Sequence, residues 1–426
     1  MTVTTDASAL DLGAFLHPGD RIVWGQACGE PTTLIEALIA QADTIGPGTL
    51  AAFAATSFSG ILTAEAATKL NLSSMGAIGA LRTVAAAGRL GIVPCHVSQV
   101  GPMIEQGLIG CDVAFVQVSP ADAQGNHSFG LISDFVQEAV AKARVVIAEV
   151  NERVPFTLGD AVLPSARITC AVHVSRIPVE VPAAQIGETD LAIAKIAAGY
   201  IADSAVLQVG IGAVPDAILR LLKDRRNLGV HSGMIGDGLV DLVEAGVITN
   251  ALKSIDPGVS ITGALIGTRR LYEFVDRNAR IGMRRSSYTH NEAVLSRLKQ
   301  LVTINSAIEV DLTGQVNAEQ SGAQYLGGTG GQVDYVRAGS RCSGGRSIIA
   351  LPATAKGGKI SRITSALSGP VTTARSEVDV IVTEFGAAEL KGQTLTERAR
   401  RLVGIAHPDF QEELDRAAHA IQQRGF

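Results

Sequence analysis

The sequence predicts an α/β protein made of two similar open α/β domains with mainly parallel sheets. Short apolar runs alternate along the chain with longer amphipathic stretches, as in folds where helices connect parallel strands. Glycine accounts for 46 of the 426 residues, and such an excess is typical of tight turns and of backbone that approaches a ligand. A strand, glycine loop and helix follow one another in each half of the chain, which indicates a duplicated unit.

The first predicted domain covers residues 1–185. It opens with a strand at 21–24, a glycine-containing loop, and a helix at 32–45. The β-branched run at 113–118 predicts a buried strand, and the rest of the domain is predicted to contain a helix at 135–144 and a strand at 145–150.

The second predicted domain covers residues 186–426. Pro178 and Pro182 disfavour helix in the segment before it, which we interpret as a linker. A helix at 190–201, a strand at 205–209, a glycine loop and a helix at 216–222 then repeat the plan of the first domain. Further on we expect a strand at 228–230, a hairpin-like segment at 310–316, a flexible glycine loop at 327–331, strands at 347–351 and 378–383, and helices at 395–404 and 410–423.

Composition excludes several classes of function. The chain is 46% hydrophobic and 18% charged, and 36 Lys and Arg against 41 Asp and Glu give a net charge of −5. This balance gives no electrostatic support for binding nucleic acid or anionic membranes. No apolar stretch of ~20 residues predicts a membrane span, and no signal-peptide pattern opens the chain. Five scattered cysteines without ligand spacing predict neither disulfides nor a metal site, so we expect a cytoplasmic protein.

Common nucleotide and hydrolase motifs are also missing. The loop that begins at Gly210 resembles a dinucleotide fingerprint, but Pro215 replaces its third glycine. Gly358-Lys359 lacks the upstream glycine of a P-loop, and Ile360 stands where Ser or Thr is required. The chain contains no G-x-S-x-G and no H-E-x-x-H.

Several glycine loops remain as candidates for ligand binding. The loop at 210–213 can present N–H groups to an oxyanion, although an ordinary tight turn has the same sequence. The loop at 328–331 admits a ligand or is simply flexible, and Lys356 with its basic neighbours suits a phosphate or a solvated face. The polar segment at 231–238 follows a predicted strand, which is where α/β folds place chemistry. Cys28 and Glu30 occupy the equivalent place in the first domain, where a small packed cysteine is the simpler interpretation.

In their order and spacing these motifs resemble the acetyl-CoA hydrolase/transferase family, especially its 4-hydroxybutyrate CoA-transferase-like members. The resemblance covers nearly the whole chain and is carried by 27–31, 148–151, 157–160, 208–216, 305–312, 328–331, 350–363, 382–386 and 405–410. It implies the family I CoA-transferase fold, an active site at the domain interface, and coenzyme A as part of an acyl-CoA substrate. It implies that the main CoA-binding loops lie in the second domain, with binding residues at Gly210, Gly212, Ala213, Asn305, Gly328, Gly330, Gly331 and Lys356.

The chain departs from the family at one position. The family pattern His-Ser-Glu-Met contains the glutamate that attacks the acyl-CoA, and this chain reads His231-Ser232-Gly233-Met234. Glycine has no side chain and cannot form the glutamyl-CoA thioester. Catalysis is therefore expected around Gly233, His231 and Glu30.

Three interpretations follow from this departure. Water attacks the thioester with Glu30 or His231 as general base, which we favour. Alternatively, another carboxylate such as Glu30 or Glu319 attacks, and CoA passes to a small carboxylate. In the third, the cleft binds CoA esters without turnover or supports another acyl-CoA reaction such as C–C cleavage. A homodimer is expected because most soluble oligomers are symmetric dimers.

Overall fold

Residues 3–174 form one eight-stranded parallel sheet in the computed structural model, which describes residues 2–425. In order across the sheet the strands are β1 (Val3–Asp6), β10 (Cys170–Val174), β8 (Val145–Asn151), β6 (Val113–Val118), β2 (Arg21–Trp24), β3 (Ala51–Phe53), β4 (Asn71–Ser74) and β5 (Leu90–Ile92). Every residue of β6 and β8 is buried, as expected for central parallel strands covered on both faces. Helices α1 (Thr32–Ile45), α2 (Leu81–Ala86), α3 (Val97–Glu105) and α4 (Val136–Lys142) complete this unit.

The second sheet has six strands. Their order is β12 (Gly229–Val230), β11 (Val206–Val209), β17 (Leu301–Asn305), β22 (Arg346–Ala350), β26 (Val380–Thr383) and β27 (Gly386–Glu389). Only the β26–β27 pair is antiparallel among these strands. The helices of this unit are α5 (Glu188–Ala198), α6 (Ala213–Arg220), α7 (Asp237–Glu244), α8 (Arg269–Val275), α9 (Ser286–Thr289), α10 (Glu292–Leu295), α11 (Gln332–Arg341), α12 (Leu395–Gly404) and α13 (Pro408–Arg424).

Short strand pairs connect these elements. They are β7 (Asn126–Ser128) with β9 (Val162–Pro164), β13 (Met234–Ile235) with β15 (Ala264–Leu265), β14 (Ser260–Thr262) with β16 (Ile281–Met283), β18 (Glu309–Asp311) with β19 (Val316–Asn317) and β25 (Ile363–Thr364), β20 (Gln320–Ser321) with β21 (Gln324–Tyr325), and β23 (Thr354–Ala355) with β24 (Ile360–Ser361).

The predicted fold class, α/β with mainly parallel sheets, is confirmed. β2, α1, β6 and α12 begin and end at the predicted residues. α6 begins three residues before its prediction because Pro215 lies in its first turn, where no intrahelical N–H is needed and proline is tolerated.

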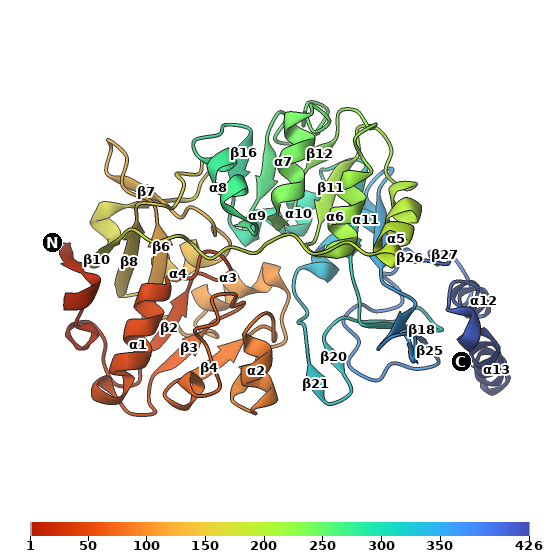
Figure 1. Cartoon of the computed structure of the whole chain (residues 1–426), viewed down its shortest axis with the longest axis horizontal. Helices are drawn as coiled ribbons and strands as arrows, with labels where there is room; N and C mark the ends of the chain where they lie inside the picture. The colour runs from red at the N-terminus through yellow and green to blue at the C-terminus, as the bar shows by residue number, and fades with distance from the viewer. Residues whose placement is uncertain (1, 426) are drawn as a thin grey trace.

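The two units lie side by side along the long axis of the molecule, the first from red to yellow and the second from green to blue (Figure 1). Residues 175–187 contain neither helix nor strand and connect β10 to α5. One continuous apolar core crosses between the units, with Val116 and Ile132 from the first and Val209 and Leu265 from the second. The predicted division at residues 185 and 186 stays a prediction.

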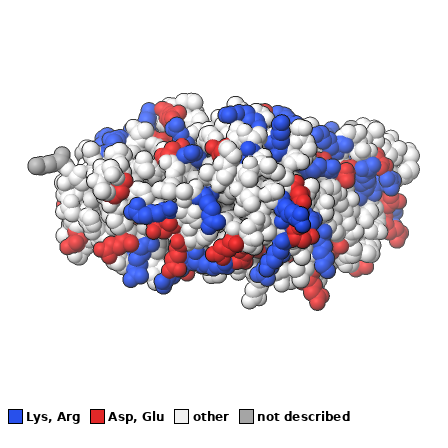
Figure 2. Space-filling model, turned by 90° about the horizontal axis from the view of Figure 1, so that it is seen from above, with Lys and Arg blue, Asp and Glu red and all other residues white. Residues whose placement is uncertain are grey.

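The surface carries mixed charge. On the face drawn in Figure 2, Lys and Arg are interspersed with Asp and Glu rather than gathered in one field of a single sign. Within residues 2–425, no helix is both long enough and apolar enough to cross a bilayer.

Candidate active site

A cavity of about 240 Å³ lies between the two units. Parallel strands place the loops after their carboxyl ends at one sheet edge, where α/β proteins bind ligands, and such loops of both sheets reach this cavity. From the first unit it is lined by Gln26, Ala27, Thr56, Phe58, Met75, Ile78, Val97, Ile132 and Asp134. From the second it is lined by Gln208, Gly210, Ile211, Gly233, Met234, Ala264, Ile266, His290, Asn305, Gly330, Gly331, Gln332 and Tyr335.

The loop after β11 contains two backbone N–H groups without an acceptor among the described residues, at Ile211, which lines the cavity, and at Gly212, which follows it outside the cavity. The N–H of Gly210 donates to the carbonyl of Ile304 at 3.3 Å, whereas the N–H groups of Ile211 and Gly212 meet no acceptor in residues 2–425. Gly212 has a φ of +123°, a conformation that glycine adopts readily and other residues rarely do. The two unpaired donors therefore precede the start of α6, where an anionic oxygen is favoured.

Gly233 faces the cavity, but the ring of His290 fills the space beside it. A Cβ atom on Gly233 would lie 2.5 Å from Cε1 of His290, and one on Gly331 would lie 2.4 Å from its Nε2. The ring therefore lies between two glycines, with its centroid 4.8 Å from that of Tyr335. The sequence did not single out His290, because nothing local connects it to two glycines that are distant in the chain.

His290 is held neutral in a defined orientation. Burial, and secondly the nearby His231, lower its pKa to about 3. Its Nδ1 lies 2.9 Å from Thr289 Oγ1, which donates to the carbonyl of Arg285 at 3.4 Å. The contact with Thr289 fixes the orientation of the ring, and the tautomer decides which ring nitrogen carries the proton.

His231, predicted to act at the site, does not line this cavity. Its side chain is fully buried, and neither ring nitrogen has a hydrogen-bond partner in the described part of the chain. Burial, and secondly the charge of Lys253, lower its pKa to about 3. The chain bends at Gly233, so Gly233 lines the cavity whereas His231 lies in the protein interior. A buried ring outside the cavity cannot reach a water or substrate in it, so this geometry does not support His231 as the predicted general base.

Glu30, the other predicted base, lies below the cavity wall rather than in it. It is fully buried, and its Oε2 accepts from the N–H groups of Phe58 and Ser59 at 2.9 Å each. Burial raises its pKa. The carboxylate therefore positions the loop that carries Phe58 into the cavity. Cys28 is also buried, and burial raises its pKa to about 11, which suits the predicted packed thiol.

The predicted CoA-binding residues divide into two groups. Gly210, Asn305, Gly330 and Gly331 line the cavity, and the Asn305 amide is paired with Gln208 at 3.1 and 3.4 Å. Gly212, Ala213, Gly328 and Lys356 lie outside it. Lys356 is exposed between β23 and β24, where it has a φ of +50°. Glu319, the alternative attacker, is buried against Tyr325 and Thr372.

The glycine loop at 327–331, predicted to be flexible, is bound to the first unit. Ala77 N–H donates to the carbonyl of Gly327 at 2.7 Å, and Val97 N–H donates to that of Gly330 at 3.0 Å. A Cβ on Gly328 would lie 3.0 Å from the Cα of Gly76. Glycine is needed here for close approach between two backbones, so this part of the prediction is wrong.

Asp134 is, with His290, a titratable residue of this cavity that sequence reasoning missed. It is buried, and its Oδ2 accepts from Gln26 Nε2 while Oδ1 accepts from Phe135 N–H at 2.6 Å. Burial is the largest cause that raises its pKa, to about 7. In the sequence it stands directly before the predicted helix at 135–144, where an aspartate resembles an ordinary helix start.

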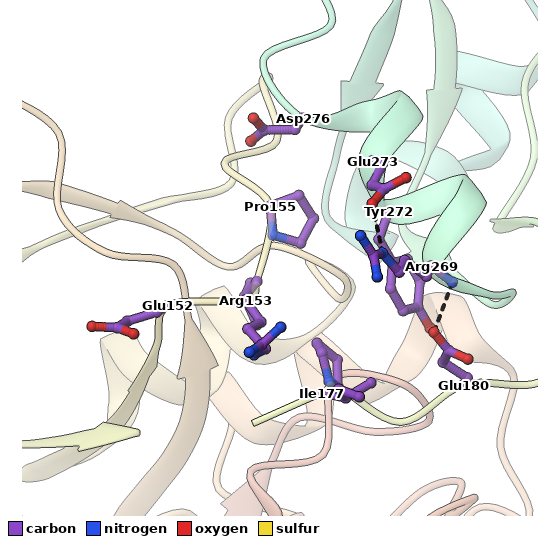
Figure 3. Close-up of a pocket in the computed structure, with 11 residues that line it drawn as sticks. Glu152, Arg153, Pro155, Ile177, Glu180, Arg269, Tyr272, Glu273 and Asp276 are labelled. Atoms are coloured by element: carbon purple, nitrogen blue, oxygen red, sulfur yellow. Dashed lines mark hydrogen bonds and ion pairs between the residues drawn. The ribbon is translucent and has the colours of Figure 1, made fainter. Parts of the chain in front are cut away.

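A larger hollow of about 630 Å³ lies elsewhere on the domain boundary, between the loop at 152–155, residues 177–180 and α8 (Figure 3). Three of its charged residues contact one another, since Arg269 Nε lies 2.6 Å from Glu273 Oε1 and the backbone N–H of Arg269 donates to Glu180 at 2.9 Å. None of the predicted site residues lines it. The smaller cavity, where strand ends and titratable groups converge, is therefore the candidate active site.

The chain thus has two mainly parallel α/β units with a candidate site in the cavity between them. Residues 7–219 match the acetyl-CoA hydrolase/transferase N-terminal domain, and residues 267–418 match the C-terminal domain of the same name. The chain belongs to the acetyl-CoA hydrolase/transferase family, and it is an enzyme acting on acyl-CoA.

Individual relatives are similar to this protein over most of its length. It is 41% identical over 397 residues, 92% of each chain, to 4-hydroxybutyrate coenzyme A transferase of Clostridium kluyveri. The crystal structure of RipA from Yersinia pestis superposes with a TM-score of 0.93 at 33% identity, covering 99% of this chain and 98% of that one. For 4-hydroxybutyrate CoA-transferase of Porphyromonas gingivalis the TM-score is 0.82 at 32% identity, with 99% and 98% covered.

Proposed function

We propose that this enzyme hydrolyses acyl-CoA thioesters in the interdomain cavity, with water as the group that attacks the carbonyl carbon. The observation that carries the proposal is the state of position 233, where the family resemblance implies an attacking glutamate. Gly233 offers no side chain, and neutral His290 fills the space that a side chain would enter. A protein carboxylate at this position is thus replaced by a neutral imidazole ring.

The loop after β11 suits the charge that develops during such an attack. Hydrolysis of a thioester passes through a tetrahedral intermediate with a negative oxygen, and fixed N–H donors stabilise that oxygen more than the initial carbonyl. The unpaired N–H of Ile211, which lines the cavity, is the donor we assign to it.

The lining of the cavity favours a short, uncharged acyl group. Met75, Ile78 and Ile132 give it an apolar wall, and no Lys or Arg lies among the lining residues. An acyl group with its own carboxylate would meet Asp134 without a compensating cation, which is unfavourable in a buried site. A volume of about 240 Å³ holds the thioester end of the substrate, and the remainder of CoA extends outside.

CoA transfer is the second candidate. It is favoured by the names of relatives that share most of their length with this chain, such as the transferase of Clostridium kluyveri. In that case an acceptor carboxylate takes the place of water, and a covalent enzyme–CoA thioester is expected.

Steady-state assays separate the two candidates. Butyryl-CoA is incubated with the enzyme alone and again with acetate, while CoA release and new acyl-CoA are both measured. Hydrolysis predicts CoA release without acetate and no acetyl-CoA in its presence. Acetyl-CoA that forms only with acetate, with a covalent thioester trapped by borohydride, would contradict the proposal; absence of any product would contradict both candidates.

A further inference from the structure

The wall contributed by the first unit contains the cavity's one carboxylate. Among the lining residues only Asp134 is acidic, and the other titratable side chains are His290 and Tyr335. Tyr335 Oη donates to the carbonyl of Thr289 at 2.8 Å, and burial raises the pKa of its hydroxyl well above the ordinary value. Tyr335 is therefore not available as a base, which leaves Asp134 and His290.

Backbone pairing fixes Asp134 relative to Gly233. Ile132 pairs with Ala264, and Ala264 pairs in turn with Met234, so the three lie in consecutive positions across one ribbon. All three line the cavity. Since neighbouring strands are ~4.8 Å apart, the backbones of the two outer segments lie about 10 Å apart, with the strand of Ala264 between them.

Two further backbone hydrogen bonds connect the segment at 133–134 to the second unit. Ser133 N–H donates to the carbonyl of Gly263 at 2.9 Å, and Ser286 N–H donates to that of Asp134 at 2.9 Å. The position of the carboxylate thus depends on both units, whereas its hydrogen bonds to Gln26 and Phe135 come from the first unit alone.

The charged surroundings of Asp134 leave it without a strong ionic partner. Glu138, next on α4, disfavours its ionisation, and no ion pair of the described residues includes it. Arg285, which precedes α9, interacts with Glu138 instead. Across the cavity, His290 is neutral. With a pKa of about 7 the carboxyl exchanges a proton near neutral pH, whereas His290 at about 3 is a much weaker base.

We propose that Asp134 is the general base of thioester hydrolysis and that Gln26 is the positioning residue for its carboxylate. The inference rests on the proposed function. As the water oxygen bonds to the carbonyl carbon, its proton passes to Asp134. The C–S bond then breaks, its electron pair goes to the CoA sulfur, and the proton follows from Asp134. The products are a carboxylic acid and CoA, and the carboxylate is restored.

The test compares Asp134→Asn with Glu138→Gln, a control that alters a nearby buried carboxylate outside the cavity. We expect the Asp134→Asn variant to lose about 10²–10⁴-fold in kcat with little change in the Kd of a non-hydrolysable acyl-CoA analogue. In the wild type, kcat/KM should rise with pH through an apparent pKa near 7, and this limb should disappear in the variant. Formate should partly restore activity to Asp134→Ala. The control should retain the wild-type kcat, and its pH limb should move downward because Glu138 no longer disfavours the ionisation of Asp134.

Gln26→Leu keeps the proposal falsifiable if the Asp134 variants do not fold. Loss of the amide that donates to the ionised carboxylate should move the pH limb upward. A wild-type rate of CoA release retained by Asp134→Asn, or an unshifted limb in Gln26→Leu, would overturn the role of Asp134 while leaving hydrolysis intact. A wild type that releases no CoA without an acceptor would instead overturn the proposed function and this inference with it.

Discussion

The two walls of the cavity differ in what they present to a substrate. The wall from the second unit presents backbone, with glycines at 210, 233, 330 and 331 and a neutral histidine packed between two of them. The wall from the first unit presents a carboxylate among apolar side chains. In the proposed mechanism, the wall from the second unit therefore accommodates the thioester and the wall from the first unit moves the proton.

Among the tests of this difference between the walls, the largest effect is expected on the free energy of unfolding when Asp134 is replaced. Burial raises the pKa of Asp134 from 3.8 to about 7, so between these pH values the folded protein holds a proton that the unfolded chain has lost. Stability conferred by this group therefore falls as the pH rises through that window and is fully lost above about 7. Asp134→Asn, which does not titrate, should be more stable than the wild type by up to about 4 kcal/mol at pH 8, with no gain near pH 4.

Urea unfolding at pH 4, 6 and 8 checks this expectation. A variant that is less stable than the wild type at pH 8 would show that the carboxylate strengthens the fold, and the contrast between the walls would weaken.

Glycine packing on the opposite wall can be tested by a double-mutant cycle. Gly233→Ala places a Cβ 2.5 Å from His290, and overpacking of this kind costs about 1–3 kcal/mol. Combined with His290→Ala, the same substitution should cost at least about 1 kcal/mol less. Gly404→Ala, which meets nothing within 4 Å at the end of α12, is the matched control. Additive costs in the cycle would argue against steric coupling.

Acyl-chain selectivity sharpens the account of the first wall. Butyryl-CoA and succinyl-CoA have the same chain length, but only the second adds a carboxylate to a cavity lined by Asp134 and no cation. We expect kcat/KM at least about tenfold higher for butyryl-CoA, which corresponds to ~1.4 kcal/mol. Equal values for the two esters would mean that the acyl group does not enter this cavity.

The smallest effect is expected outside both walls. Lys356 is exposed on the turn between β23 and β24, so it can meet only the solvated part of CoA. Lys356→Ala should raise KM about two- to fivefold at low salt, with kcat unchanged, and the difference should fade at high salt because exposed charges are screened. A change in kcat would place this lysine closer to the chemistry than the structure does.

Local pattern predicted much of the fold. β2, α1, β6 and α12 follow from runs of apolar or amphipathic residues with clear ends, and hydrophobic periodicity is a strong signal for such elements. The glycine wall was also predicted in part, because Gly210, Asn305, Gly330 and Gly331 belong to contiguous motifs.

The residues that the sequence did not reveal depend on contacts between distant segments. In the sequence, Asp134 resembles an ordinary helix start. Only the structure shows that the neighbouring Ser133 N–H donates to the carbonyl of Gly263 in the other unit and so holds Asp134 at the cavity. His290 gains meaning only beside Gly233 and Gly331. Glu30 and His231 were predicted as bases from their motifs, whereas burial removes both from the cavity surface. A sequence motif shows which residues are close along the chain, whereas a role as base depends on whether the side chain points into the cavity.

The central claim is that water, and not a carboxylate, receives the acyl group. A single-turnover reaction in ¹⁸O-labelled water, with enzyme in excess over butyryl-CoA and no acceptor present, tests it most directly. The account predicts stoichiometric CoA release and one ¹⁸O atom in the butyrate. Butyryl-CoA that persists until acetate is added, or butyrate without label beside ¹⁸O in the protein, would contradict it.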